Sequence, residues 1–364
     1  MKLKIIDRYI AQELFMPFIS GVLAFTTILS GSTILFQLVG DAIKYSIPLS
    51  SLLLLIILKL PYVIALSIPM ATLFSTISVF GRLGNDLEIL ALRAHGVSIS
   101  RLLIPVVIIG ICISLVNLWF NEEVVPKSST TARNLFLSFR DSDTPSIQTN
   151  INVTEYKDKL PYRIINVQEK EGVNLKNITV AEYETGSLIR LIRSKTGKWI
   201  TEGGWEFYNG IMHIFPQNNP KHISIIEFEK ELINIELRPA DLINRNKNIE
   251  EMNRKEVIDK INFIKKTGQD PIKLIMDYHM KVSIAFSSLI YCILGACMGL
   301  KPHRSSSSVG IGLSLLIIFG YIILMSIGMG FGLSRILPPI LAAWFPNIII
   351  GLFSITLIRK LATQ

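Results

Sequence analysis

The sequence predicts an α-helical membrane protein with six transmembrane helices, three on each side of an inserted all-β, jellyroll-like domain. Three observations lead to this fold class. Of the 364 residues, 50% are hydrophobic, and the mean hydropathy is +0.45, a high value for a soluble protein of this length. The apolar residues gather in runs near both ends of the chain. Between these runs, hydrophobicity alternates with the period of a β-strand.

Six apolar runs are long enough to cross a bilayer, whose hydrocarbon core requires about 20 residues of helix. Pro61 and Pro69 predict a kink in the second run. An amphipathic interfacial helix is expected over 3–16, leading into an uncleaved first run. Asp7 and Glu13 within it argue against a signal peptide. The runs cover residues 14–39, 52–80, 102–120, 282–300, 309–331 and 336–358.

Positive residues in the short loops predict the orientation of the chain. The loops on one side are rich in Lys and Arg, whereas the opposite short loops hold only Lys44 and Arg335. Because cytoplasmic loops carry the excess of positive charge, both termini are predicted to be cytoplasmic and the β-domain extracytoplasmic. The cytoplasmic residues are Lys2, Lys4, Arg8, Arg82, Arg93, Arg101, Lys301, Arg304, Arg359 and Lys360.

These patterns divide the chain into four regions. An N-terminal transmembrane half covers 1–120, the β-domain 121–248, a connecting segment 249–275, and a C-terminal transmembrane half 276–364. The connecting segment contains a helix of mixed charge over 249–268, which Gly268 is expected to end.

Short strand-like segments in series, without intervening helices, predict a sandwich or an open jelly roll. Glu-Gly, Thr-Gly, Gly-Gly and Asn-Gly pairs punctuate them, and Asn209-Gly210 is the clearest hairpin signal. Such a module can bind an extended partner at its edge or hold an apolar chain inside; a rigid spacer is the alternative. The segments are 146–156, 162–167, 178–183, 187–194, 199–202, 205–208, 210–215 and 222–237.

A polar stretch between the second and third runs, residues 81–101, is called the elbow. We expect a surface helix of about three turns over 84–96, laid across the cytoplasmic face of the membrane. Acidic residues near its start and a basic residue near its end suit the helix macrodipole. The residues behind this expectation are Asn85 or Asp86 as cap, Glu88 in the first turn, the apolar Leu87 and Leu90, Arg93 near the end, and Gly96 as the left-handed terminator.

Two features of the apolar runs each have two interpretations. Lys59 is a cation within the second run, which indicates a polar cavity for an anionic substrate; its stem could equally reach the headgroups. Small residues recur four apart at Gly295 and Gly299, and at Gly328 and Gly332. Such spacing lets helices pack closely, either within the chain or between two subunits.

Sites for catalysis are missing from the sequence. It contains no G-x-x-x-x-G-K-[ST] loop, HExxH, CxxC or nucleophile elbow. Cys112, Cys292 and Cys297 fall inside apolar runs and are interpreted as buried small residues. No bound metal or cofactor is expected, and if ATP is used, another chain must supply its site. The net charge of +9 is unaccompanied by an aromatic-interleaved basic stripe, so no nucleic-acid partner is expected.

The chain resembles the lipopolysaccharide-export permeases LptF and LptG, and is closer to the LptG branch. The resemblance covers all six apolar runs, whereas the β-domain is similar only in kind. It is carried by Asp7-Arg8-Tyr9-Ile10, Ile68-Pro69-Met70-Ala71, Leu87 to Val97, Glu123-Val124-Val125-Pro126, Ala132-Arg133-Asn134, Lys265 to Asp270, Leu337-Pro338-Pro339-Ile340 and Pro346.

This resemblance implies a multi-pass protein of the bacterial inner membrane with a periplasmic β-domain. Such a permease pairs with a second LptF/LptG-like permease, or with a second copy of itself, and with two copies of the cytoplasmic ATPase LptB, which uses the ATP. The complex extracts lipopolysaccharide and passes it to LptC- and LptA-like periplasmic jellyroll proteins on the way to the outer membrane. The alternative is a non-transporting module that transmits ATPase-driven motion to an extracytoplasmic protein.

The resemblance also implies roles for particular residues. The elbow helix is similar to the family's coupling helix, in which Glu88 matches the acidic contact and Gly96 the terminal glycine; Leu87 and Leu90 belong to the same motif. Asp86 and Arg93 are added on charge and position. LptG relatives carry lysines on the first two spans that face lipid phosphates. Here the first run has no Lys, and Lys59 and Tyr62 flank Pro61 instead, so the head group of the lipid stays open.

Overall fold

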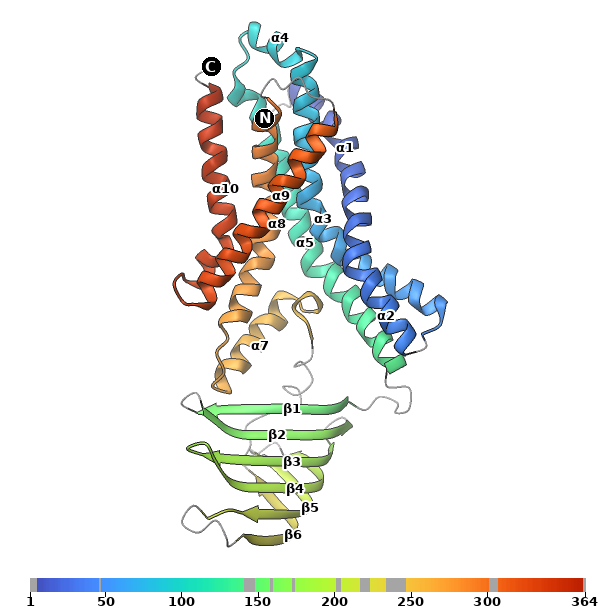
Figure 1. Cartoon of the computed structure of the whole chain (residues 1–364), viewed down its shortest axis with the longest axis vertical. Coiled ribbons are helices and arrows are strands. Elements are labelled where there is room, and N and C mark those ends of the chain that lie inside the picture. Colours follow the sequence, from blue (N-terminus) through green and yellow to red (C-terminus); the bar gives the residue numbers. More distant parts are fainter. Residues whose placement is uncertain are drawn as a thin grey trace. The chain divides into compact units, whose positions relative to one another are not determined.

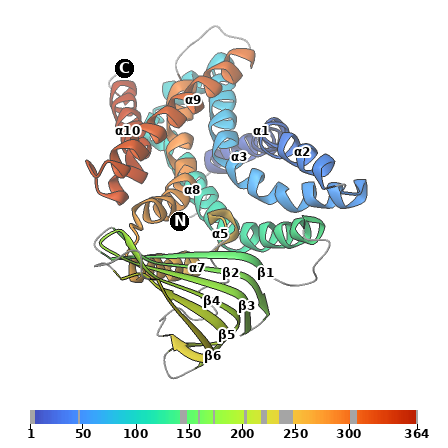
Figure 2. The same cartoon turned by 60° about the horizontal axis from the view of Figure 1, so that its bottom comes forward.

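A computed structural model describes residues 5–45, 47–140, 148–157, 160–171, 174–200, 204–216, 223–233, 247–300 and 307–362. The chain forms two compact units, whose elements are shown in Figures 1 and 2. The first unit is helical and combines Met1–Phe139, Ile249–Arg254 and Ile272–Gln364. The second contains the strands and combines Arg140–Asn248 with Lys255–Pro271.

The helical unit contains six helices that are long and apolar enough to cross a membrane: α1, α3, α5, α8, α9 and α10. They match the six predicted spans, and the predicted fold class is confirmed. Lys2, Lys4, Lys301 and Arg304, which supported the orientation, lie outside the described residues. The helical elements are α1 Ile5–Ser30, the π-helix η1 Gly31–Leu35, α2 Phe36–Lys44, α3 Leu49–Asn85, α4 Glu88–Ala94, α5 Ile99–Arg140, α8 Ile272–Gly299, α9 Ser307–Leu333 and α10 Pro339–Ala362.

Several helix boundaries differ from those predicted; α8, for example, begins at Ile272 and not at residue 282. The expected interfacial helix is the first part of α1, which continues without a break from Ile5. The third span does not end at residue 120, because α5 continues to Arg140 and all but its last residue belongs to the helical unit. The extension is polar in composition, but Ala132, Leu135, Phe136 and Phe139 recur at helical spacing and pack into an apolar cluster. The β-domain therefore begins later than residue 121.

Glycines allow close helix packing within this unit. A Cβ on Gly299 would lie 2.8 Å from a backbone nitrogen of α3, and a Cβ on Gly295 would lie 3.1 Å from a carbonyl oxygen of the same helix. On α9, a Cβ on Gly328 would lie 2.6 Å from the oxygen of Ala342, and one on Gly332 2.8 Å from the Cβ of Ala342. All four glycines thus contact neighbouring helices of the same chain.

The second unit contains one antiparallel six-stranded sheet in the order β1-β2-β3-β4-β5-β6, so that each strand pairs with its neighbours in sequence. Figure 2 shows the strands side by side in this order. Parts of the segments expected over 146–156, 199–202 and 222–237 lie outside the described residues. The strands are β1 Gln148–Lys157, β2 Leu160–Glu171, β3 Asn174–Glu184, β4 Ser187–Ile200, β5 Gly204–Ile214 and β6 Ser224–Ile233.

The predicted hairpin at Asn209-Gly210 is wrong. Both residues lie inside β5, where Gly210 pairs with β4 and with β6. A Thr-Gly turn does occur between β3 and β4, where Thr185 and Gly186 have φ values of 47° and 84°. Asn209 also has a positive φ of 53°, a conformation that Asn tolerates better than most residues, and this explains why the pair resembles a turn.

A row of exposed polar residues crosses the sheet at the level of Asn209. On β3, β4 and β5, buried residues alternate with outward-facing ones, but two consecutive residues at this level are not buried before the alternation resumes. The alternation therefore shifts by one residue in each strand at the same level, and both halves of the strand keep their apolar side chains on the inner face. This polar row consists of Gln168, Asn177, Lys195, Asn209 and Glu229.

The inner face of the sheet is apolar over most of its length. The row Val153, Ile165, Val180, Ile192, Met212 and Ile226 follows the strand register from β1 to β6. One end of this face carries charges that are paired across the strands, here called the charge ladder. Glu155 lies opposite Arg163, Arg163 opposite Glu182, and Glu182 opposite Arg190. Only 3% of Glu182 is exposed.

The connecting segment consists of a short 3-10 helix, η3 Ile249–Glu251, followed by α7 Arg254–Lys266. Gly268 ends α7 with a φ of 71°, as predicted. Its place beside β1 leaves no space for a side chain, since an added Cβ would overlap the backbone oxygen of Tyr156. The backbone N–H of Tyr156 donates to the oxygen of Thr267 at 2.8 Å, which attaches the end of α7 to β1.

Candidate functional site

The elbow contains a helix that is shorter than predicted. The preceding helix α3 runs to Asn85, and Asp86 closes it. Leu87 then takes a left-handed conformation with a φ of 59°, and α4 occupies Glu88–Ala94. The expectation that Asn85 or Asp86 caps the elbow helix is therefore wrong, because both belong to the end of α3. The helical signal of 81–86 extends the membrane helix instead of starting a new one.

The end of α4 follows the prediction. Gly96 has a φ of 83°. Its N–H donates to the oxygen of Arg93 at 2.9 Å, and the N–H of Val97 donates to the oxygen of Leu92 at 3.1 Å. This pair of bonds is a Schellman motif, which requires a residue that tolerates the left-handed conformation. Both boundaries of α4 are thus sharp left-handed turns, so that the helix is a separate rigid piece.

The two faces of α4 differ in exposure. Ile89 is buried and Leu92 is half-buried, so this face lies toward α1, α3 and α5. On the other face, Leu87 is 61% exposed and Leu90 is 60% exposed. Arg93 is also exposed and lies in the last turn. The free surface of α4 is therefore an apolar pair beside one positive charge.

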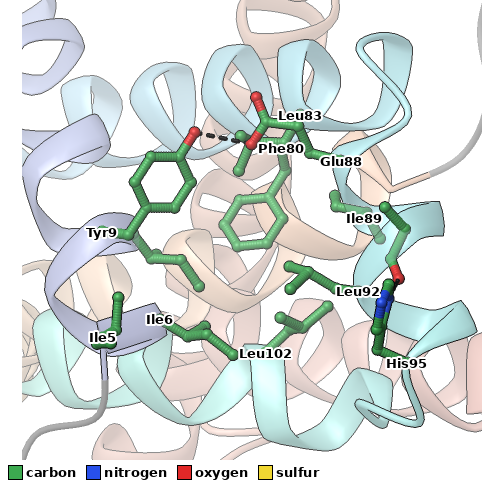
Figure 3. A pocket seen from close by; sticks show the side chains of 12 residues that line it. Ile5, Ile6, Tyr9, Phe80, Leu83, Glu88, Ile89, Leu92, His95 and Leu102 are labelled. Atoms are coloured by element: carbon green, nitrogen blue, oxygen red, sulfur yellow. Dashed lines mark hydrogen bonds between the residues drawn. The ribbon is translucent and has the colours of Figure 1, made fainter.

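A cavity of about 530 Å³ lies between part of α4 and the membrane helices. Figure 3 shows Ile6, Phe80 and Leu102 pointing into it from α1, α3 and α5. Glu88 on α4 and His95 just after it stand at the rim, together with Tyr9 on α1. The remaining lining is Ile5, Ile10, Leu83, Ile89, Ala91 and Leu92. Since voids remove van der Waals contacts, apolar packing holds α4 only in part.

A hydrogen bond crosses the rim of this cavity. The hydroxyl of Tyr9 on α1 donates to Oε2 of Glu88 on α4 at 2.7 Å (Figure 3). Glu88 is half-buried, so its carboxylate is directed at α1 and not only at solvent. The resemblance marked Glu88 as a contact for another protein; the structure shows in addition an internal partner that the sequence pattern did not reveal.

Two further ion pairs connect α1 with the elbow. Nη1 and Nη2 of Arg101 donate to the two carboxylate oxygens of Asp7 at 2.6 and 2.8 Å, and only 6% of Asp7 is exposed. Glu13 pairs with Arg82 at the end of α3, and Arg82 also lies 3.8 Å from a carboxylate oxygen of Asp86. The helical spacing of Asp7, Ile10 and Leu14, which are all buried, was the available signal that this part of α1 packs against protein.

The other candidate residues lie elsewhere. Lys59 and Tyr62 are half-buried on the part of α3 remote from α4. Tyr62 packs at the edge of an apolar cluster that includes Leu55 and Val63. Within the described part of the chain, Lys59 forms no ion pair, and no group of His, Cys, Asp and Glu residues could hold a metal ion.

Comparisons with known proteins identify the chain. A comparison with curated proteins finds no match. The family model described as "Lipopolysaccharide export system permease LptF/LptG" matches residues 8–360, which include both membrane halves, the elbow and the β-domain. Because the match spans nearly the whole chain, this protein belongs to the LptF/LptG family of lipopolysaccharide export permeases.

Proposed function

We propose that this chain is the membrane subunit of an ABC-type exporter, in which α4 docks onto a separate cytoplasmic ATPase. Family membership supports a lipopolysaccharide-export permease in general, and the observation that carries the finer proposal is the exposed face of α4. Leu87 and Leu90 project from a short, sharply bounded helix. Exposed apolar side chains on such an element are typical of a protein contact.

The positive charges support a cytoplasmic place for this helix. Figure 1 shows α4 and the end of α10 at the same end of the helical unit. Arg93 and Arg101 lie in the elbow, and Arg359 and Lys360 lie in the last turn of α10. Because cytoplasmic loops carry the excess of positive charge, this end of the helical unit is the cytoplasmic one. The β-domain, which follows the third span, is then periplasmic.

Energy for export comes from the partner in this proposal. The sequence lacks the glycine-rich loop that holds nucleotide phosphates in P-loop ATPases. A partner that supplies this loop, and whose subunits close on ATP, would move α4. The chain itself binds no cofactor in this proposal and has no catalytic role.

The β-domain supports a lipid as cargo. Its inner face is lined by apolar rows that cross all six described strands, a surface suited to acyl chains. We infer that the domain receives the lipid and passes it to similar periplasmic jellyroll proteins. A second permease, or a second copy of this chain, would complete the membrane cavity. Lys59 and Tyr62 remain candidates for contact with the head group.

Replacing Leu90 by Arg tests the docking face. The change places a charge on the exposed face without removing buried contacts, so the protein should insert and fold normally. We expect co-purification of the ATPase to fall at least tenfold, since desolvating an unpaired charge at an interface is costly. Glu88→Arg should abolish lipid export as well.

Leu232→Arg is the matched control, because Leu232 on β6 is 63% exposed but lies in the other unit. It should leave ATPase co-purification unchanged. Equal amounts of bound ATPase in wild type and Leu90→Arg would refute α4 as the docking element.

A further inference from the structure

The first turns of α1 contact three segments of the elbow. Asp7 pairs with the start of α5, Tyr9 with α4, and Glu13 with the end of α3. These three residues occupy a single element that is far from the elbow in sequence. The N-terminal part of α1 therefore acts as a brace that ties together three segments, which otherwise contact one another through apolar packing.

The cavity makes this brace important for passing movement of α4 on to the membrane helices. A tightly packed interface passes on displacement because its atoms resist compression. Here a cavity of about 530 Å³ lies between α4 and the helices beneath it, so a small movement of α4 can be absorbed by empty space. The bond from Tyr9 to Glu88 spans the rim of this space and links α4 directly to α1.

The boundaries of α4 allow it to move as a unit. Leu87 and Gly96 lie at its two ends with φ values of 59° and 83°. Element-terminal residues of this kind absorb the backbone changes of a hinge. A tilt of α4 about these points would displace Glu88, and Tyr9 would carry that displacement into α1.

Once moved, α1 acts directly within the membrane part of the bundle. Gly21 of α1 packs against α3, where an added Cβ would lie 3.2 Å from the Cα of Ala71. Five residues further along α1, the hydroxyls of Thr26 and Ser67 are 2.9 Å apart. A shift that begins at Tyr9 thus reaches the middle of the first two spans.

We propose that Tyr9 is a positioning residue that transmits movement of α4 into α1, with Asp7 and Glu13 holding α1 in place for this task. The proposal rests on the proposed function of α4 as a docking helix. It adds that docking and transmission are separable, because docking uses the exposed face of α4 and transmission uses the face toward α1.

Tyr9→Phe tests this directly, because it removes the hydroxyl and keeps the ring. In the purified complex of this chain with its ATPase and second permease, we expect assembly and ATP hydrolysis to stay within twofold of wild type. Lipid released per ATP hydrolysed should fall on the order of tenfold, since a hydrogen bond to a charged group is lost. Tyr45→Phe is the control, because the Tyr45 ring packs on Phe136 and its hydroxyl has no partner within the described residues.

A charge exchange tests the brace independently of any loss of folding. Asp7→Arg and Arg101→Asp should each reduce lipid release, whereas the double variant restores opposite charges at the same place and should recover most of it. An unchanged ratio of lipid released to ATP hydrolysed in Tyr9→Phe would overturn the inference. So would a loss of assembly that equals the loss of transport, because Tyr9 would then serve docking.

Failure of the proposed function has a different signature. If wild-type protein purifies without an ATPase, or if Leu90→Arg binds the ATPase normally, docking through α4 is refuted before Tyr9 is tested. If Leu90→Arg loses the ATPase but Tyr9→Phe transports normally, docking stands and only the brace is wrong.

Discussion

The elbow and the β-sheet both place carboxylates inside the protein, but their surroundings differ. In the charge ladder, Glu182 accepts hydrogen bonds from both Arg163 and Arg190 and adjoins fully buried apolar rows. At the elbow, Glu88 accepts a hydrogen bond from Tyr9 at the rim of a cavity. Local stability follows from buried contacts and protected hydrogen bonds. The comparison indicates a rigid sheet and a movable elbow.

The largest expected effect on the free energy of unfolding comes from removing a carboxylate of the charge ladder. Glu182→Ala leaves Arg163, whose side chain is 11% exposed, without its buried partner. Loss of one member of a buried ion pair costs about 3–5 kcal/mol. We expect the lower end of this range, because the side chain of Arg190 is 39% exposed and can be solvated.

The measurement is urea unfolding of the full chain, followed by fluorescence of Trp199 and Trp205 on the sheet. Trp119 and Trp344 on the helices are replaced by Phe in all variants so that they do not contribute. Glu229→Ala is the control, because Glu229 is an exposed member of the polar row, and it should change the free energy of unfolding by less than about 0.5 kcal/mol. Equal effects of the two substitutions would contradict a structural role of the ladder.

The sheet also shows where sequence reasoning fails. The strands predicted to begin at 178, to end at 194 and to break at Asn209-Gly210 all stop at the polar row. Period-two alternation is the signal for a strand, and this row shifts the alternation by one residue in β3, β4 and β5. In the sequence, β4 and β5 therefore each resemble two short strands, and β3 resembles one that starts late. The shifts lie opposite one another in neighbouring strands, but the sequence alone does not show which residues pair across strands.

The elbow was predictable in part, for a different reason. Gly96 and the polar composition identify a polar connection that contains a helix, because local signals determine helix ends. The start at Glu88 was missed because 81–85 continue α3. The contacts of Asp7 and Tyr9 were missed because they join α1 to segments more than 70 residues away in sequence, which no local pattern reports. The apolar spans were predictable, since length and hydropathy define them.

An intermediate effect on stability is expected from enlarging one small residue in the sheet, Gly197, and a smaller one from enlarging Ala91 in α4. At Gly197 on β4, an added Cβ would lie 2.5 Å from Cδ1 of Ile178 and 2.8 Å from Cδ1 of Phe207, and both side chains are buried. Gly197→Ala should therefore cost about 1–3 kcal/mol. Ala91 lines the cavity under α4, so Ala91→Leu should be accommodated at less than about 0.5 kcal/mol.

Amide hydrogen exchange of the full chain in lipid nanodiscs measures both substitutions locally. Gly197→Ala should speed exchange in β4 and β5, and Ala91→Leu should leave exchange in α4 unchanged or slow it. A faster exchange in α4 after Ala91→Leu would show that the cavity is less open than its volume indicates, and the contrast between the two regions would be lost.

The smallest expected effect concerns an ion pair on the outer face of the sheet, in which the side chain of Lys230 is exposed and that of Glu206 is partly buried. Glu206 lies 2.5 Å from Nζ of Lys230. Hydrogen bonds from Lys230 and then from Tyr208 lower the pKa of Glu206 below its usual 4.5, assisted by the charge of Lys198, while partial burial opposes the shift. A lowered pKa in the folded state means that the pair stabilises the sheet above pH 4.5, and that this contribution is lost as the pH falls through the lowered value.

Glu206→Gln cannot titrate, so its unfolding midpoint in urea should depend less on pH between neutral and strongly acidic solution. Lys230→Met should weaken the same dependence, because it removes the largest cause of the shift. If all three proteins showed the same acid dependence, this surface pair would contribute nothing, and the stability of the sheet would lie in its buried rows and the charge ladder.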